Sequence, residues 1–226
     1  MQQRFEKRLA AIVAADSDAL HGGLKGVEKE SLRVAADGLL STRPHPVRLG
    51  SALTNRYVTT DFSEALLEFV TPAFPTTWEA LQCVCDIHQF TYAQLDDEML
   101  WSASMPCLIP DDDDIPLARY GTSNVGRMKT IYRRGLGYRY GRQMQVIAGV
   151  HFNYSLPAEF WPAYREILGV EEGQEEFRSA QYLNLIRNFR RMGWLVLYLF
   201  GASPAVCKSF AGGAVSGLKS LNADTY

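Results

Sequence analysis

Two glutamates in one short segment are the first residues whose spacing could do chemistry. Glu28 and Glu30 lie two apart in GLKGVEKESLRV, residues 23–34, where the pattern predicts a β-strand. Side chains two apart on a strand share one face, roughly 6.5–7 Å from each other along the chain. Neighbouring carboxylates raise one another's pKa unless a cation lies between them. The pair therefore indicates either a cation site or a solvent-facing strand edge of mixed charge.

A second acidic cluster lies in TTDFSEALLEF, residues 59–69, which contains Asp61, Glu64 and Glu68. Glu64 and Glu68 share a face whether the segment is a helix or a strand. Carboxylates among so many apolar residues are costly unless they are paired or bind a ligand. The alternative is an amphipathic element that keeps its acids in water.

The third candidate is His151, which lies with Asn153 and Gln145 in RQMQVIAGVHFNYSLP, residues 142–157. Period-two alternation over about twelve residues predicts one long strand with a polar and an apolar face. Such a polar face is open to water or lines a ligand cavity, and a lone histidine on it can be purely structural. Acids from two elements and one imidazole are together suited to Mg²⁺, which prefers hard oxygen ligands.

The elements around these residues mix strands and helices without a βαβ rhythm, and no glycine-rich phosphate loop is present. This favours an α+β fold with an antiparallel sheet. Periodicity and turn signals predict the following elements: a surface helix over the first 20 residues ended by His21-Gly22-Gly23, a turn at Asp37-Gly38, strand rather than helix in 57–71, a helix from Thr76 with a Thr76/Glu79 capping box, an irregular stretch over 101–142, a helix after Pro157, and a largely buried helix over 174–200.

Composition narrows the class of protein. The 226 residues are 47% hydrophobic with a net charge of −2, which predicts a folded protein and no nucleic-acid or membrane binding. The longest apolar run, residues 194–206, is shorter than the roughly 20 residues of a membrane helix. The N-terminus shows no signal-peptide core, so we expect a cytoplasmic protein. The four cysteines are expected to be small reduced, buried thiols, and the run Asp111–Asp114 a solvated stretch without calcium-loop spacing.

Six long motifs carry a family resemblance. In chain order they are GLKGVEKESLRV, LGSALTNRYVTTDFSEALLEFVTP, SMPCLIP, LARYGTSNVGRMKTIYRRGL, YGRQMQVIAGVHFNYSLP and YLFGASPAVC. Together they resemble the proteobacterial type of glutamate–cysteine ligase. The resemblance implies a glutamine-synthetase-like α+β fold with a curved antiparallel sheet flanked by helices. It also implies Mg²⁺, with Mn²⁺ as an alternative, and ATP as co-substrate.

The resemblance also implies a reaction. ATP phosphorylates the γ-carboxylate of glutamate, and the amine of cysteine then displaces phosphate, with metal ions clamping the phosphate charge. The protein would act on these small molecules as a monomer at full length. Its residue assignments are metal and ATP for Glu28, Glu30, Glu68 and His151; catalysis for Asp61 and Arg133; and substrate binding for Tyr132, Gln145 and Asn153.

Members of this family are about twice as long as this chain. We therefore expect residues 1–226 to be the N-terminal part of one catalytic domain, inactive or poorly folded without the rest. Two other functions are kept open. One is a carboxylate–amine ligase with another amine acceptor, and the other is a non-catalytic part that binds nucleotide or a partner protein.

Overall fold

The computed structural model describes residues 2–15, 18, 20–106, 108–109, 111–201, 205–210 and 217–225. These residues pack into two compact units. One unit comprises residues 1–24 and 154–204, and the other comprises residues 25–153 and 205–226. The single catalytic domain expected over 1–226 stays a prediction.

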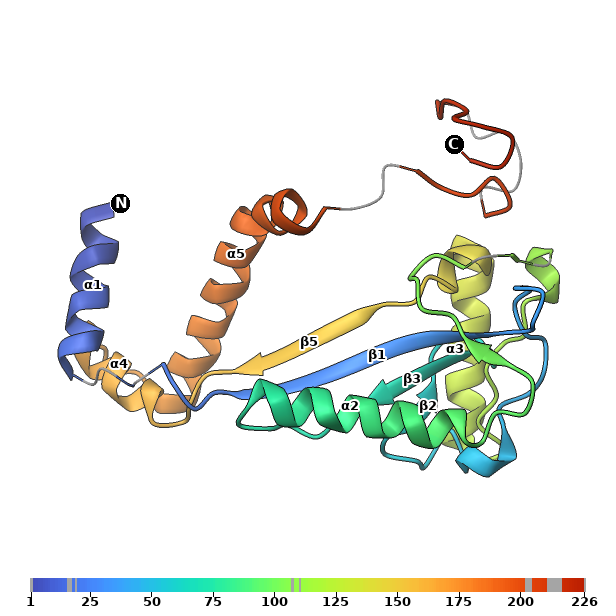
Figure 1. The fold of residues 1–226 in the computed structure, drawn as a ribbon. Helices are drawn as coiled ribbons and strands as arrows, with labels where there is room; N and C mark the ends of the chain where they lie inside the picture. The colour runs from blue at the N-terminus through green and yellow to red at the C-terminus, as the bar shows by residue number, and fades with distance from the viewer. Residues whose placement is uncertain are drawn as a thin grey trace. The chain divides into compact units, whose positions relative to one another are not determined.

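The larger unit is built on an antiparallel sheet around one long strand (Figure 1). The strands are β1 (Leu24–Val34), β2 (Val58–Thr60), β3 (Leu66–Val70), β4 (Met99–Leu100) and β5 (Val150–Ser155). Their order is β2-β3-β1-β4, and β5 also pairs with β1. The strand predicted for 23–34 is confirmed. Strand rather than helix is confirmed in 57–71, where a turn separates β2 from β3.

One face of the sheet packs against α2 (Thr77–Tyr92). The core on this face contains Leu49, Val58, Leu67, Phe69, Ile87 and Leu100. The predicted capping box is present, because Thr76 Oγ1 accepts from the Glu79 amide and the Glu79 carboxylate accepts from the Thr76 amide. Helix α2 therefore begins where the sequence predicts.

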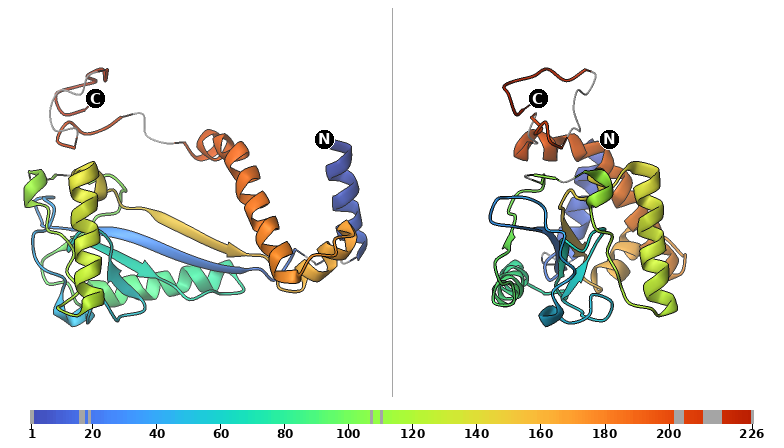
Figure 2. Two further views of the ribbon diagram at one scale, coloured as in Figure 1. Left: turned by 180° about the vertical axis from the view of Figure 1, so that it is seen from behind. Right: turned by 90° about the vertical axis from the view of Figure 1, so that its right-hand side faces the viewer.

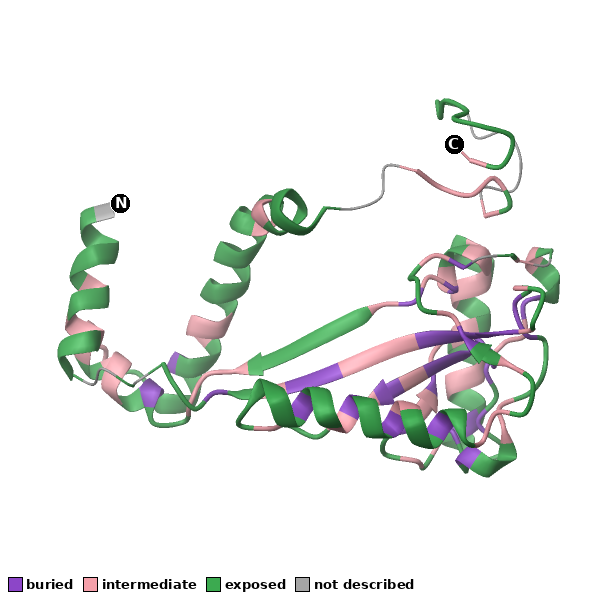
Figure 3. Ribbon diagram, in the orientation of Figure 1, coloured by how far each residue is buried: buried purple, intermediate pink, exposed green. Residues whose placement is uncertain are grey.

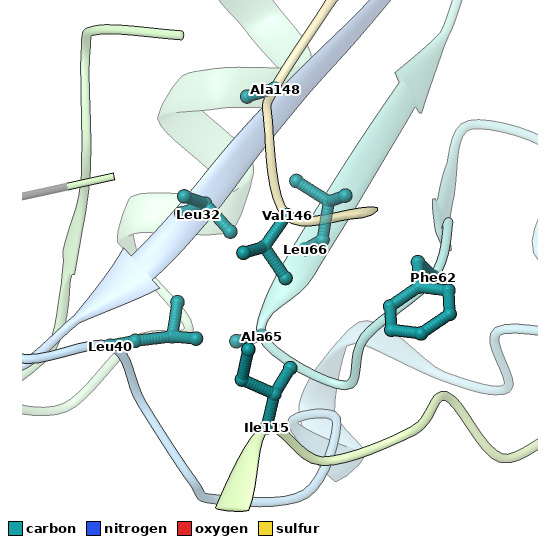
Figure 4. Close-up of a cluster of buried hydrophobic side chains, with 8 residues drawn as sticks. All are labelled: Leu32, Leu40, Phe62, Ala65, Leu66, Ile115, Val146 and Ala148. Atoms are coloured by element: carbon teal, nitrogen blue, oxygen red, sulfur yellow. The ribbon is translucent and has the colours of Figure 1, made fainter. Parts of the chain in front are cut away.

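The opposite face carries a second core, drawn in Figure 4. It contains Leu32, Leu40, Phe62, Ala65, Leu66, Ile115, Val146 and Ala148, and Leu136 of α3 (Asn124–Tyr140) packs against it. The side view shows α2 and α3 on opposite sides of the sheet (Figure 2). The expected antiparallel sheet flanked by helices is confirmed.

Helix α3 corrects the expectation of an irregular segment over 101–142. Glycines made a helix unlikely on propensity, but three of them lie within its seventeen residues. Gly126 has a packing reason, since a Cβ there would lie 2.3 Å from the Tyr120 carbonyl oxygen. Ser123 caps the helix by accepting from the Gly126 amide. Close packing and the cap outweigh the poor propensity.

The long strand predicted over 142–157 is also wrong in extent. Residues Gln143–Gln145 form a short 3-10 helix, and β5 begins only at Val150. Val146 and Ala148 are buried in the core, whereas Val150 and Phe152 on the same predicted apolar face are 65% and 62% exposed. The Gln143 amide is bound by Asp112 Oδ1 at 2.8 Å, which favours a turn there.

The smaller unit contains α1 (Gln2–Ala15), α4 (Phe160–Leu168) and α5 (Gln174–Phe200) around Phe160, Trp161 and Phe177. Helix α1 ends at Ala15, before the predicted stop at residues 21–23. Helix α5 is present as predicted, but it is exposed along most of its length and only Phe177 is buried (Figure 3). None of the described helices is both long and apolar enough to cross a membrane.

The turn at Asp37-Gly38 is confirmed, with Gly38 at φ 82°. The cysteines depart from the expected buried thiols, because Cys85 is exposed and Cys83 and Cys207 are half-buried, while Cys107 lies outside the described residues. In the run 111–114 three aspartates are exposed, as expected, and Asp112 is half-buried.

Candidate acidic site on strands β1, β3 and β5

Strand register brings the two predicted acidic clusters together. Glu28 and Glu30 lie on one face of β1, and Glu30 is the direct cross-strand partner of Glu68 on β3. Glu68 is in turn paired with Thr59 on β2, two residues before Asp61. Sequence spacing predicted each cluster separately. The antiparallel pairing of β1 with β3 joins residues of both clusters into one site.

The charges of this site are incompletely balanced by the protein. Burial and, to a smaller extent, the negative charges of Asp61, Glu30 and Glu28 together raise the pKa of Glu68 to about 6. Burial also raises the pKa of Glu30, and a hydrogen bond from the Gly149 amide partly opposes this. Carboxylates that lie opposite one another on paired strands repel. The site therefore favours an added positive charge.

Strand β5 supplies partners for the β1 carboxylates. His151 Nδ1 lies 3.2 Å from Glu28 Oε2, and Asn153 Nδ2 donates to Glu28 Oε1 at 2.9 Å. The hydrogen bond to Glu28 raises the pKa of His151. His151 is thus brought into the site as predicted. The amide of Asn153, predicted to bind substrate, is bonded to Glu28.

Gly149 is a residue of this site that sequence reasoning missed. Its amide donates to Glu30 Oε2 at 2.6 Å, and its carbonyl accepts from the Glu30 amide at 2.9 Å. A Cβ at this position would lie 3.3 Å from His151 Nε2 and 3.5 Å from Glu30 Oε2. The available signal was a glycine next to a strand, which often marks a close approach of backbone to another group.

Arg133 reaches the edge of the site from α3. Its Nη2 lies 3.7 Å from Asp61 Oδ1, and its Nε donates to the Asp61 carbonyl. The guanidinium lies 4.7 Å from the centre of the Tyr120 ring. Tyr120, also missed by sequence reasoning, donates from its buried hydroxyl to the Thr60 carbonyl at 2.7 Å. Asp61 and Arg133 are therefore brought together.

Tyr132 and Gln145 are not joined to the acidic site by any side-chain hydrogen bond among the described residues. Tyr132 follows Ile131 on α3 with a 64% exposed side chain, and Gln145 is half-buried at the end of the 3-10 helix. Their assignment to a substrate pocket remains a prediction.

Glu64 has a different role from the other acids. It is only 6% exposed, and its two carboxylate oxygens accept from the amides of His45 and Arg119, each at 2.5 Å. Its carbonyl accepts from Arg33 Nη2 at 3.0 Å. Arg33 is itself buried and forms an ion pair with Glu98. This network holds the turn between β2 and β3, which begins at Asp61 and leads into β3, the strand that bears Glu68.

The carboxylates are oxygen donors of the kind that Mg²⁺ binds. Within the described part of the chain, no three acidic, histidine or cysteine side chains are already gathered closely enough to hold a metal ion. Glu28 and Glu30 instead accept hydrogen bonds from β5 and the segment before it. The donor chemistry fits a divalent cation, and these hydrogen bonds compete with it.

Fold and site together define an α+β protein with an acidic face on an antiparallel sheet. Comparison with known proteins identifies its family: the family model "Glutamate-cysteine ligase" matches residues 9–226, so the chain belongs to the glutamate–cysteine ligase family. It is 50% identical to the glutamate–cysteine ligase of Pseudomonas putida (strain W619) and 51% identical to that of Azotobacter vinelandii. Each alignment covers 100% of this chain and 43% of the relative.

Solved structures share the fold. The glutamate–cysteine ligase of Francisella tularensis, crystallised in complex with AMP, is 37% identical, with a TM-score of 0.83 over 91% of this chain and 40% of that one. A bifunctional glutathione synthetase from Pasteurella multocida is 29% identical, with a TM-score of 0.74 over 86% of this chain and 24% of that one. The glutamine-synthetase-like fold and the family resemblance are thus confirmed. The chain spans less than half the length of these relatives.

Proposed function

We propose that residues 1–226 form the metal- and ATP-binding part of a cytoplasmic glutamate–cysteine ligase that acts on small-molecule substrates. The ligase joins the γ-carboxylate of glutamate to the amine of cysteine. The observation that carries the proposal is the pairing of Glu30 with Glu68 beside Glu28 and His151, in a chain of this family. The AMP complex of the Francisella tularensis relative supports a nucleotide site in this fold.

A divalent cation suits the charge of the site. Burial and the negative charges of Asp61, Glu30 and Glu28 raise the pKa of Glu68, and a cation beside its carboxylate would oppose this. Glu28, Glu30 and Glu68, with His151, are the residues that would hold Mg²⁺ or Mn²⁺. When bound, the cation neutralises phosphate oxygens and so stabilises charge that develops during phosphoryl transfer. Binding requires Glu28 to give up its bonds to His151 and Asn153, or to share them.

The remaining residues position reactants in this proposal. Transfer of the γ-phosphoryl group of ATP to the glutamate γ-carboxylate forms an acyl phosphate and releases ADP. The cysteine amine then forms the amide bond and expels phosphate. Arg133, half-buried beside Asp61, presents a guanidinium that suits carboxylate or phosphate oxygens. Tyr132 and Gln145 are assigned to the cysteine pocket.

The experiment joins residues 1–226 to the part of the Pseudomonas putida ligase that they do not match. ADP release should require glutamate, cysteine and Mg²⁺ together. Glu28→Gln and Glu68→Gln should each lower kcat by about 10²–10³-fold, because each removes a charge that holds the cation. The exposed Glu166→Gln is the matched control and should leave kcat unchanged. Near-normal turnover in both site variants would refute the assignment.

A further inference from the structure

Helix α3 presents a second cation, Lys129, beside Arg133 at the edge of the acidic site. Five of the seventeen residues of α3 are arginine or lysine, and none is acidic. Lys129 and Arg133 are four residues apart, so their side chains lie on the same side of the helix. Arg133 reaches Asp61, whereas Lys129 has no carboxylate partner in the described part of the chain.

Both cations lie against the same aromatic ring, that of Tyr120. The distance from Lys129 Nζ to the centre of this ring is 5.0 Å, and that from the Arg133 guanidinium carbon is 4.7 Å. A cation within about 6 Å of a ring centre is attracted by the electrons of the ring face. The ring of Tyr120 therefore draws two like charges to one place, although they repel each other.

Tyr120 is itself held firmly between the sheet and α3. It is 4% exposed, and its hydroxyl donates to the Thr60 carbonyl at 2.7 Å, with the Asp61 carbonyl 2.9 Å from the same hydroxyl. Its main chain lies so close to α3 that a Cβ on Gly126 would lie 2.3 Å from the Tyr120 carbonyl oxygen. Tyr120 thus ties the turn that bears Asp61 to the helix that bears the two cations.

The protein uses the hydrogen-bond donors of these cations only in part. Arg133 Nε donates to the Asp61 carbonyl, and Nη1 donates to the Lys129 carbonyl at 3.2 Å. Arg133 Nη2 lies 3.7 Å from Asp61 Oδ1, which is longer than an ordinary hydrogen bond. The half-buried Lys129 ammonium donates to no oxygen of the described residues. Its three N–H donors are therefore available to an anion.

We propose that Lys129 and Arg133, packed on the Tyr120 ring, together bind an oxyanion of a substrate, either a phosphate or a carboxylate. Lys129 is then a further substrate-binding residue, and Tyr120 is a positioning residue that acts through the two cations. A guanidinium offers paired N–H donors to such an anion, and an ammonium adds a point charge. The identity of the substrates, ATP and the amino acids, rests on the proposed ligase function.

The test is an NMR titration of residues 1–226 with two probes, inorganic pyrophosphate for the phosphate source and glutarate for the carboxylate source. The Lys129 Hε and Arg133 Nε–H signals should shift together for at least one probe, and the probe that binds more tightly identifies the source. Lys129→Gln should weaken the binding seen at Arg133 by about threefold or more. Arg127→Gln is the matched control and should bind like the parent, because Arg127 is exposed and lies two residues from Lys129, on another side of the helix.

Substitutions of Tyr120 separate positioning from a merely structural role. Tyr120→Phe keeps the ring, so the Lys129 Hε signals should keep the upfield shift that an aromatic ring face causes. Tyr120→Leu removes the ring, so these signals should move downfield and probe binding should weaken by about threefold or more. Circular dichroism checks the fold of each variant. Lys129→Gln changes a half-buried polar side chain and tests the proposal even where Tyr120→Leu unfolds the chain.

Three results would overturn the proposal: no shift of either signal with millimolar probe, unchanged affinity in Lys129→Gln, or an equal shift of the Arg127 signals, which would indicate general attraction of anions to a basic helix. A folded Tyr120→Leu variant with unmoved Lys129 signals would refute the role of Tyr120. The titration involves no ATP turnover, so it can fail while the ligase activity stands. In the protein joined to the Pseudomonas putida part, Lys129→Gln should raise the KM of the substrate that the tighter probe represents by about tenfold, with a smaller change in kcat.

Discussion

Replacing Glu64 with glutamine tests whether one buried carboxylate holds the turn of the acidic site. Both oxygens of Glu64 accept from backbone amides, those of His45 and Arg119, at 2.5 Å each. A glutamine side chain has one oxygen acceptor, and its NH₂ group would face the second amide donor. Glu64→Gln therefore loses one hydrogen bond and places two donors against each other, with little change in volume.

The magnitude follows from the burial. A hydrogen bond to a charged group contributes about 1.5–3 kcal/mol, and a buried donor without a partner costs about 1–3 kcal/mol. Because the two effects overlap at one amide, we expect Glu64→Gln to lower the free energy of unfolding by about 2–4 kcal/mol. That is a large share of the roughly 5–15 kcal/mol by which domains are stable.

Urea unfolding of residues 1–226 measures this loss, and Glu166→Gln is the control. Glu166 is exposed, so its substitution should change the free energy of unfolding by less than about 0.5 kcal/mol. Amide NMR shifts of His45 and Arg119 give a second readout, because at least one should move upfield as its hydrogen bond is lost. A loss below about 1 kcal/mol, with both shifts unchanged, would refute the reasoning.

Three further predictions concern the sheet and its neighbours. Glu68→Gln should stabilise the metal-free chain against urea unfolding by about 1–2 kcal/mol at pH 7 after solvent screening. The same substitution should give no such gain at pH 4. The reason is that the pKa of Glu68 is raised to about 6, so its carboxylate is ionised in the folded chain, at a cost in stability, only as pH rises through that value. An equal gain at both pH values would contradict this. Gly126→Ala should cost about 2–3 kcal/mol by steric overlap with a backbone carbonyl, whereas Gly135→Ala, with open space around it in the same helix, should stabilise by up to about 1 kcal/mol in thermal melts. NMR titration should show the pKa of His151 above its ordinary value, because His151 pairs with Glu28. The pairing then stabilises the fold fully below the ordinary pKa, and this stabilisation is lost as pH rises through the folded pKa. Glu28→Gln should lower the pKa of His151, and an unchanged titration would exclude the contact.

Local patterns were enough for much of the sheet and for the identity of the acids. Alternation and β-branched residues predicted β1 and the strands in 57–71, and Thr76 with Glu79 predicted the start of α2. These features depend on residues within a few positions of each other, which is the range over which capping and periodicity act. The same spacing showed that Glu28 and Glu30 share a face.

Tertiary structure decided what those residues do. Only the pairing of β1 with β3 sets Glu30 opposite Glu68. Only the position of β5 brings His151 and Asn153 within hydrogen-bond distance of the Glu28 carboxylate. Glu64 and Glu68 were equivalent in the sequence, yet one binds backbone amides in the core and the other faces its fellow acids. Helix α3 likewise packs Leu136 against a core whose residues lie far from it in the chain. Spacing along a strand determines which side chains share a face, whereas the element packed against that face determines whether a carboxylate there is satisfied, and that element comes from elsewhere in the sequence.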